Sequence, residues 1–181
     1  GAEIKAGVPL FFNKADEKMF FVSPVSGELV EIVRGARRRI LTLKILADKK
    51  QEYVKHPVLD LTSVDGSAVR DFLLKSGVWP FIKQRPYDII ANTDVTPKAI
   101  FVSACSTAPL AADIDFTLQG KETELQAAIT ALSKLTPGKV HVTIGKSSDS
   151  PFANIEGITL HKISGPHPSG LVGTQINKID P

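Results

Sequence analysis

The side chains best suited to nucleophilic or acid–base chemistry stand apart from one another in this sequence. Cys105 is the only cysteine, and no histidine lies at a spacing that would activate it as a nucleophile. Ser169 lacks the Gly-x-Ser-x-Gly surroundings of a nucleophile elbow. We therefore expect no catalytic set, and we expect Cys105 to be a buried structural residue. No second histidine or cysteine stands at metal-ligand spacing from His56, His141, His161 or His167, so no metal site is expected.

Phosphate binding, another kind of chemistry, needs glycines that let the backbone approach the ligand closely. The stretch from Lys75 to Pro86 holds one glycine, Gly77, followed by the bulky run Trp79, Pro80 and Phe81. No Gly-x-Gly-x-x-Gly run follows any predicted strand. We therefore expect no dinucleotide site. Two roles stay open for Trp79 and Phe81, namely packing in the core and lining an apolar pocket.

The composition is that of an ordinary folded globular protein, with 43% hydrophobic and 23% charged residues. No apolar run approaches the length of about 18 residues that a membrane-spanning helix needs, and no signal peptide is apparent. The basic run of Arg34 and Arg37 to Arg39 is expected to be either a solvated turn or a contact for acidic protein or lipid head groups. Because no aromatic residues interleave with it, we expect no nucleic-acid binding. The single cysteine excludes an internal disulfide, which fits a reducing compartment.

The first part of the chain alternates short apolar runs with turns, which is typical of β-structure. Strands are predicted at Val8 to Phe12, Met19 to Val22, Glu28 to Val33 and Arg39 to Ile45. So many short strands indicate a small all-β sandwich, which we place at residues 1–48. The mostly polar residues 49–64 are predicted to form a linker.

Residues 65–164 have a different pattern, in which helices alternate with apolar strands. Asp65 is predicted to cap a helix from Gly66 to Lys75 that ends at Gly77, and a second helix is predicted from Glu122 to Leu135. The strand predicted at Ala99 to Ala104 is apolar throughout, as in a buried parallel sheet. Further strands are predicted at Lys139 to Ile144 and Ile158 to Ile163.

The fold class is therefore expected to be mixed α/β, with a small β sandwich followed by an α/β domain. The tail, residues 165–181, is rich in glycine and proline, and Ser164 to Gly170 is expected to form a rigid loop. A strand is predicted after this loop, at Thr174 to Ile179.

The segment Pro24-Val25-Ser26-Gly27-Glu28-Leu29-Val30 resembles the second half of a biotinyl or lipoyl carrier domain. The resemblance implies a barrel-sandwich hybrid whose modified lysine sits on a hairpin tip upstream of the Ser-Gly turn. The family's spacing places that lysine at Asp16, with Lys14 and Lys18 on either side of it. Because a strand changes faces at every residue, such an offset alters what the tip presents. We therefore expect a carrier-like fold that carries no cofactor.

The order of these two regions resembles the family of A-type subunits of the sodium-translocating NADH:quinone reductase. The stretches that carry the resemblance are Ser23 to Val33, Pro97 to Asp113 and Gly165 to Ile179. The family is related to the flavin-binding subunit of respiratory complex I and to the C-type subunit of the Rnf complex. The resemblance therefore implies a Rossmann-like α/β domain at residues 65–164. It also implies that residues 165–181 begin a β-grasp-like domain.

Those relatives hold FMN with a Gly-rich loop after the first helix and have an acidic residue near the position of Cys105 to Thr107. This chain has neither feature, so the resemblance implies a flavin scaffold whose flavin site is lost. An apolar remnant of that cleft would suit a quinone. The residues expected to form the quinone pocket are Trp79, Phe81, Lys83, Arg85 and His167.

The resemblance further implies a peripheral subunit on the cytoplasmic face of the bacterial inner membrane, held there by the other subunits of a sodium-pumping complex. That complex would pass electrons from NADH to ubiquinone, with flavins and iron centres in partner subunits. This chain would bind no redox cofactor and would not be catalytic alone. Two alternatives stay open: a structural adaptor of the same complex, and a free-standing flavin- or nucleotide-binding enzyme, against which the missing Gly-rich loop argues.

Overall fold

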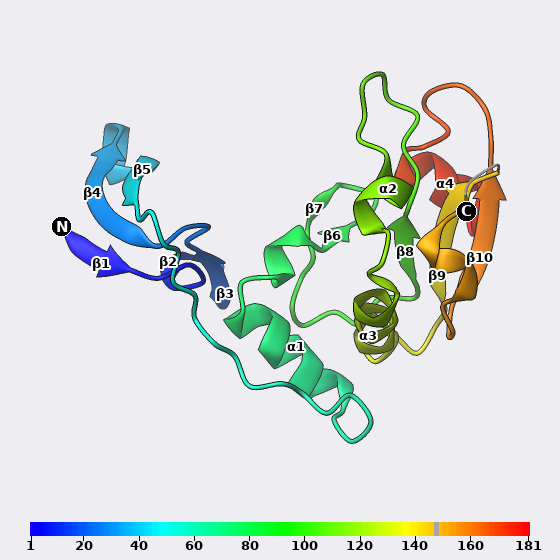
Figure 1. Ribbon diagram of the computed structural model, residues 1–181, viewed down its shortest axis with the longest axis horizontal. Helices are drawn as coiled ribbons and strands as arrows, with labels where there is room; N and C mark the ends of the chain where they lie inside the picture. Colours follow the sequence, from blue (N-terminus) through cyan, green and yellow to red (C-terminus); the bar gives the residue numbers. More distant parts are fainter. Residues whose placement is uncertain (147–148) are drawn as a thin grey trace. The chain divides into compact units, whose positions relative to one another are not determined.

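The computed structural model describes residues 1–146 and 149–181, and the chain divides into two compact units (Figure 1). The N-terminal unit consists of residues 1–58, 70–84 and 89–93. The C-terminal unit consists of residues 59–69, 85–88 and 94–181. Helix α1 (Gly66–Lys75) begins in the second and ends in the first.

Two antiparallel sheets are formed by the first strands of the N-terminal unit. One has the strand order β1 (Ala2–Ile4), β4 (Gly27–Arg34) and β5 (Ile40–Ala47), with the short 3-10 helix η1 (Ala36–Arg38) between the last two strands. The other is a hairpin of β2 (Pro9–Asn13) and β3 (Asp16–Val22), in which Phe12 pairs with Phe20. All four predicted strands are confirmed, whereas β1 was not predicted.

The end of α1 shows why the sequence stops a helix where it does. Asp65 caps the start, since its carboxylate accepts from the backbone N–H of Ala68 at 2.8 Å. At the other end, N–H groups of Gly77 and Val78 donate to the carbonyls of Leu74 and Leu73, a Schellman arrangement. Gly77 has a φ of 73°, and a Cβ there would lie 2.5 Å from a methyl carbon of Val22. The predicted cap and stop are therefore confirmed.

After α1 the N-terminal unit continues with the 3-10 helix η2 (Trp79–Phe81) and a short hairpin of β6 (Lys83–Gln84) and β7 (Ile89–Ile90). None of these elements was predicted. The buried apolar side chains of this unit come from several segments, and they include Ala6, Met19, Leu74 and Trp79.

The C-terminal unit is built on a parallel sheet of β8 (Ile100–Ser103), β9 (Val140–Gly145) and β10 (Thr159–Ile163), in the order β10-β9-β8 (Figure 1). Between β8 and β9 run α2 (Ile114–Leu118) and α3 (Glu122–Ser133); the 3-10 helix η3 (Pro151–Asn154) precedes β10. Ile129 of α3 packs with Val140, Val142 and Ile144 in the main core. The predicted parallel strands and second helix are confirmed, whereas α2 was not predicted.

Helix α4 (Val172–Ile179) replaces the strand that we predicted at Thr174 to Ile179, so that prediction is wrong. The β-branched residues of this segment favoured a strand. However, Val172, Ile176 and Ile179 recur at a helical spacing. Gln175 of α4 is almost fully buried and donates to Ser103 of β8, so α4 packs on the sheet face opposite the main core. Packing on the sheet rather than residue propensity decides the state of this segment.

Candidate functional site

Asp16 lies where the carrier resemblance places a modified lysine, and it forms internal hydrogen bonds. Asp16 stands at the start of β3, and its carboxylate accepts from the backbone N–H of Lys18 and from the hydroxyl of Thr93. Thr93 is buried, whereas Lys14 and Lys18 are exposed. Asp16 therefore fastens the β2–β3 turn to the segment that follows β7.

The three predicted site residues of the N-terminal unit differ in exposure. Trp79 is 4% exposed, and its indole N–H donates to the carbonyl of Ala91 at 2.8 Å. Phe81 is 82% exposed, and the side chain of Lys83 is exposed as well. Of these three residues, Phe81 and Lys83 are accessible to a ligand, whereas Trp79 is a core residue that supports η2.

In the C-terminal unit, polar side chains gather at the carboxyl end of β8, the edge at which parallel sheets bind ligands. The hydroxyl of Ser103 lies within hydrogen-bond distance of the carbonyls of Cys105 and Gly170. The amide nitrogen of Gln175 lies 2.9 Å from the Ser103 Oγ, 3.7 Å from the Cys105 Sγ and 3.5 Å from the Ser169 carbonyl. Gln175 was not predicted as a site residue; its place among the apolar residues of α4 was the available signal.

The loop of residues 165–170 closes onto the segment after β8. The N–H of Gly170 donates to the Thr107 hydroxyl at 2.9 Å, and the same hydroxyl oxygen lies 3.4 Å from the His167 Nδ1. A Cβ on Gly170 would lie 2.4 Å from the Thr107 nitrogen, so only glycine allows this approach. His167 is exposed, whereas Ser169 is buried and donates to the Gly165 carbonyl. The loop thus presents His167 at its surface.

Arg85 lies over the first turn of α4. A Cβ added to Gly173 would be 3.8 Å from the guanidinium carbon of Arg85 and from both of its terminal nitrogens. The N-cap residue of α4 is Leu171, whose side chain offers no acceptor to the free N–H groups. A cation therefore stands beside the positive end of a helix dipole, an arrangement that favours an electron-rich oxygen as a ligand. Arg85 also forms an ion pair with Asp88 at 3.7 Å, but this pair is exposed and therefore neutralises little of the positive charge at the start of α4.

Cys105 is placed within this polar cluster but is held as a thiol. Burial raises its pKa, and the negative charge of Asp115 adds to the effect, while the contacts with Ser103 and Gln175 lower it. A thiol with a raised pKa is a poor nucleophile at neutral pH. The side chain is half-buried rather than fully buried.

A histidine pair that sequence reasoning missed lies on the polar face of the same sheet. The Nδ1 of His141 is 2.9 Å from the Nε2 of His161, and the His141 ring stacks on Phe101 at a centroid distance of 4.6 Å. Burial, then the charges of His161 and Lys139, lowers the pKa of His141, and Asp180 opposes them. Residues 141, 143, 159 and 161 are polar at alternate strand positions, which was the available signal. No group of three or more metal-ligating side chains occurs among the described residues.

Two open grooves belong to other parts of the chain. One, of about 610 Å³ in the N-terminal unit, is lined mostly by charged residues, which are Glu3, Lys5, Asp48, Lys49, Lys50 and Glu52. The other, of about 400 Å³ in the C-terminal unit, runs between α2 and η3 and includes Asp115, Phe116 and Asp149. Neither is lined by any of the five predicted quinone residues.

Taken in order along the chain, a small β domain with a carrier-like turn is joined to an α/β domain with a parallel sheet. Two family models match these regions: the NqrA N-terminal barrel-sandwich hybrid domain at residues 1–48 and the NqrA second alpha/beta domain at residues 64–181. The chain belongs to the NqrA family, the A-type subunits of the Na⁺-translocating NADH-quinone reductase. The resemblance seen in the sequence is thereby confirmed.

Curated relatives, each named as the A-type subunit of the Na⁺-translocating NADH-quinone reductase, match the whole chain. The protein of Actinobacillus pleuropneumoniae serotype 5b is 36% identical over 186 residues, that of Neisseria meningitidis serogroup A 35% over 183 and that of Serratia proteamaculans 35% over 191. In each case the match covers 100% of this chain and 41% of the relative. The chain thus spans about two fifths of the length of these relatives. None of the helices in the described residues is long and apolar enough to cross a membrane.

Proposed function

We propose that this chain forms the first two domains of a peripheral subunit in a sodium-pumping NADH:quinone oxidoreductase. The observation that carries the proposal is the match of two domain models, in the same order, to residues 1–48 and 64–181. The subunit sits on the cytoplasmic face of the bacterial inner membrane and is held there by partner subunits. Electrons pass from NADH to ubiquinone through flavins and iron centres in those partners.

The chain itself carries no redox cofactor under this proposal. Asp16 takes the place of a carrier lysine and is engaged with Thr93. The stretch after α1 corresponds to the Gly-rich FMN-binding loop of the complex I flavin subunit. Here it contains the buried Trp79 and the ring of Pro80 instead of several glycines. The flavin scaffold is kept while its phosphate contacts are lost.

We also propose that the subunit helps to bind quinone. Arg85 and the free N–H groups at the start of α4 offer donors to a quinone carbonyl oxygen, and His167 offers another from the neighbouring loop. Phe81 and Lys83 belong to the N-terminal unit and remain candidate quinone residues through their own exposure. A quinone head needs little more than apolar walls and one or two such donors. The buried Trp79 contributes through its hydrogen bond to Ala91, which holds η2 in place.

Co-purification tests the assignment to the complex. The full-length protein should be isolated with the other reductase subunits from native membranes, and depletion of the subunit should abolish NADH-dependent quinone reduction. A full-length protein that purifies alone, with bound flavin or nucleotide and a turnover of its own, would establish the free-standing enzyme instead.

A titration with a soluble quinone analogue separates quinone binding from the adaptor role. Nuclear magnetic resonance shifts in the full-length subunit should include Arg85 and residues 165–173, and shifts at Phe81 and Lys83 would extend the site to the N-terminal unit. Arg85→Ala should raise the Kd of the analogue by about ten-fold or more, since a charge-assisted hydrogen bond contributes about 1.5–3 kcal/mol. Lys162→Ala, an exposed cation of β10, serves as the matched control. If saturating analogue causes no shifts, the subunit is a structural adaptor.

A further inference from the structure

The hairpin of β4 and β5 carries aliphatic side chains that remain in contact with solvent. Val30, Leu41 and Leu46 are 52%, 59% and 66% exposed, and Ile32 and Ile40 are exposed as well. They are spread over the hairpin, since the strand pairing sets Leu46 opposite Glu28 and Ile32 opposite Leu43. Exposed aliphatic side chains of this kind favour contact with a partner.

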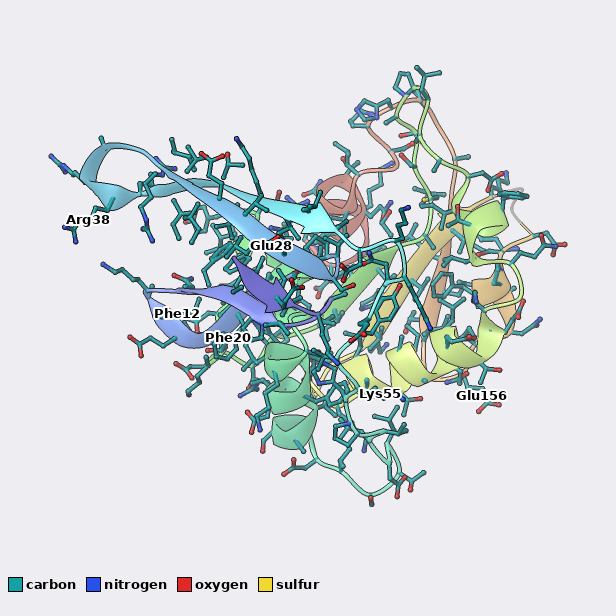
Figure 2. The ribbon with its side chains drawn as sticks, turned by 60° about the vertical axis from the view of Figure 1, so that its left-hand side comes forward. Phe12, Phe20, Glu28, Arg38, Lys55 and Glu156 are labelled. Atoms are coloured by element: carbon teal, nitrogen blue, oxygen red, sulfur yellow. The ribbon has the colours of Figure 1, made fainter. Side chains whose placement is uncertain are left out.

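The tip of the same hairpin is strongly positive and has a defined shape. Arg34, Arg37, Arg38 and Arg39 are exposed, and none of them forms an ion pair within the described residues. The Arg34 guanidinium donates to the Arg38 carbonyl at 3.1 Å, and the N–H of Gly35 donates to the Arg39 carbonyl. Figure 2 shows Arg38 at this tip, pointing outward from the hairpin.

The backbone of the tip is held in a conformation that arginine disfavours. Arg37 and Arg38 have φ values of 56° and 59°, in the left-handed region. Glycine would adopt this turn at a lower cost, so the two arginines are kept at a conformational expense. Such an outlier points to a use for the side chains themselves.

Strand β5 also offers a free edge. It is an end strand of its sheet and, within the described residues, it pairs only with β4. Its eight residues, Ile40–Ala47, contain neither proline nor glycine, and the one charged residue, Lys44, is paired with Glu31 across the strands. An unprotected edge of this length is a template for an added strand.

We propose that the β4–β5 hairpin docks an acidic, extended segment of a neighbouring subunit, which adds as a strand to β5 and places carboxylates against the tip arginines. The inference rests on the proposed function, because it assumes that neighbouring subunits exist. Anionic lipid would match the arginines, but it has no backbone to pair with the β5 edge. A polypeptide satisfies the edge, the exposed aliphatic side chains and the charge together.

The test compares two double variants of the full-length subunit during isolation of the complex. Arg37→Gly with Arg38→Gly removes two charges and keeps the turn, since both positions already have positive φ. Lys49→Ser with Lys50→Ser removes two exposed charges from the same unit and is the matched control. Because interfacial ion pairs act on dissociation, the arginine variant should leave the complex about ten-fold faster, and the control should behave as wild type.

Hydrogen exchange of the assembled complex tests the strand addition. Outward-facing backbone N–H groups of residues 40–47 should exchange about ten-fold more slowly in the complex than in the isolated full-length subunit. Equal retention of the arginine variant, or unchanged exchange at residues 40–47, overturns the inference. Arginine-dependent binding to vesicles of anionic phospholipid with unchanged exchange also overturns it, in favour of a lipid contact. A wild-type subunit that does not co-purify overturns the proposed function together with this inference.

Discussion

Gln175 shows how one polar side chain holds three segments of the C-terminal unit together. Its amide nitrogen reaches Ser103 of β8, Cys105 after β8 and the carbonyl of Ser169 in the loop before α4. Its amide oxygen has no partner within the described residues, although the side chain is 1% exposed. An unpaired buried acceptor costs about 1–3 kcal/mol. Gln175 therefore stabilises this cluster through its amide nitrogen and destabilises it through its amide oxygen.

Two substitutions of Gln175 separate these opposing effects. Gln175→Ala should lower the free energy of unfolding by about 2–4 kcal/mol, because it opens a cavity and removes the donor to Ser103. Gln175→Met keeps the volume and removes the unpaired oxygen, so it should cost less than half as much. Urea unfolding monitored by circular dichroism measures both. Equal losses would show that the amide oxygen is satisfied in solution.

His141 should make stability depend on pH in a defined direction. Its pKa is lowered in the folded state, chiefly by burial, so the unfolded state binds the proton more readily. The stabilisation is therefore present above the unfolded-state pKa and is lost as pH falls below it. Unfolding free energies measured between pH 7.5 and pH 5 should fall less steeply for His141→Asn than for wild type.

A His141 resonance that titrates at or above the ordinary histidine pKa would contradict the prediction.

At the scale of elements, the sequence correctly predicted the helices and strands whose bounds depend on residues close by in the chain. The cap at Asp65 and the stop at Gly77 gave the bounds of α1, and the apolar run around Val102 predicted a parallel strand. Helix α4 was missed because its state depends on packing against β8, which adjacent residues do not reveal. Helix α2 was missed although Asp113 caps it at the Phe116 N–H, since five residues give too short a periodic pattern.

The candidate site was predictable only in part, for a related reason. Bulky residues at 79–81 could be seen to exclude a phosphate cradle. The contact between Arg85 and the α4 N-terminus could not be predicted, because α4 itself was expected to be a strand. The pair of His141 and His161 depends on the register of β9 against β10, which adjacent residues do not specify.

Gly77→Ala should destabilise the end of α1 by about 2–4 kcal/mol. Alanine is strained at a φ of 73°, and its Cβ would meet the side chain of Val22. Removing the contact with Val22→Ala should restore part of the loss, so a double-mutant cycle should give a favourable coupling of about 1 kcal/mol. Additive effects of the two substitutions would show that the strain is confined to the backbone.

At the scale of the whole molecule, the chain combines a barrel-sandwich hybrid domain with an α/β domain. The carrier turn holds a structural carboxylate at Asp16, and the stretch after α1 holds a buried indole. The exposed groups suited to binding are the hydrogen-bond donors near the start of α4 in one unit and the basic β4–β5 hairpin in the other. Under the proposed function, these groups bind and position partners while electrons pass through other subunits.

The purified full-length subunit should therefore be colourless and unmodified. Intact mass spectrometry should give the mass of the polypeptide alone, and visible absorbance should show no flavin band. We expect that the isolated subunit does not oxidise NADH above buffer background, because residues 1–181 contain no dinucleotide-binding motif. A lipoyl, biotinyl or flavin adduct would contradict the expected loss of both sites.

The burial of Trp79 makes the N-terminal unit optically distinct. It is the only tryptophan of the 181 residues, and its indole is hydrogen-bonded inside that unit. Emission excited at the red edge of indole absorption should thus be blue-shifted and should report the melting of this unit alone. Far-ultraviolet ellipticity draws largely on α3 and α4 of the other unit. Coincident or separate midpoints of the two signals would reveal, without any label, whether the units unfold as one cooperative system.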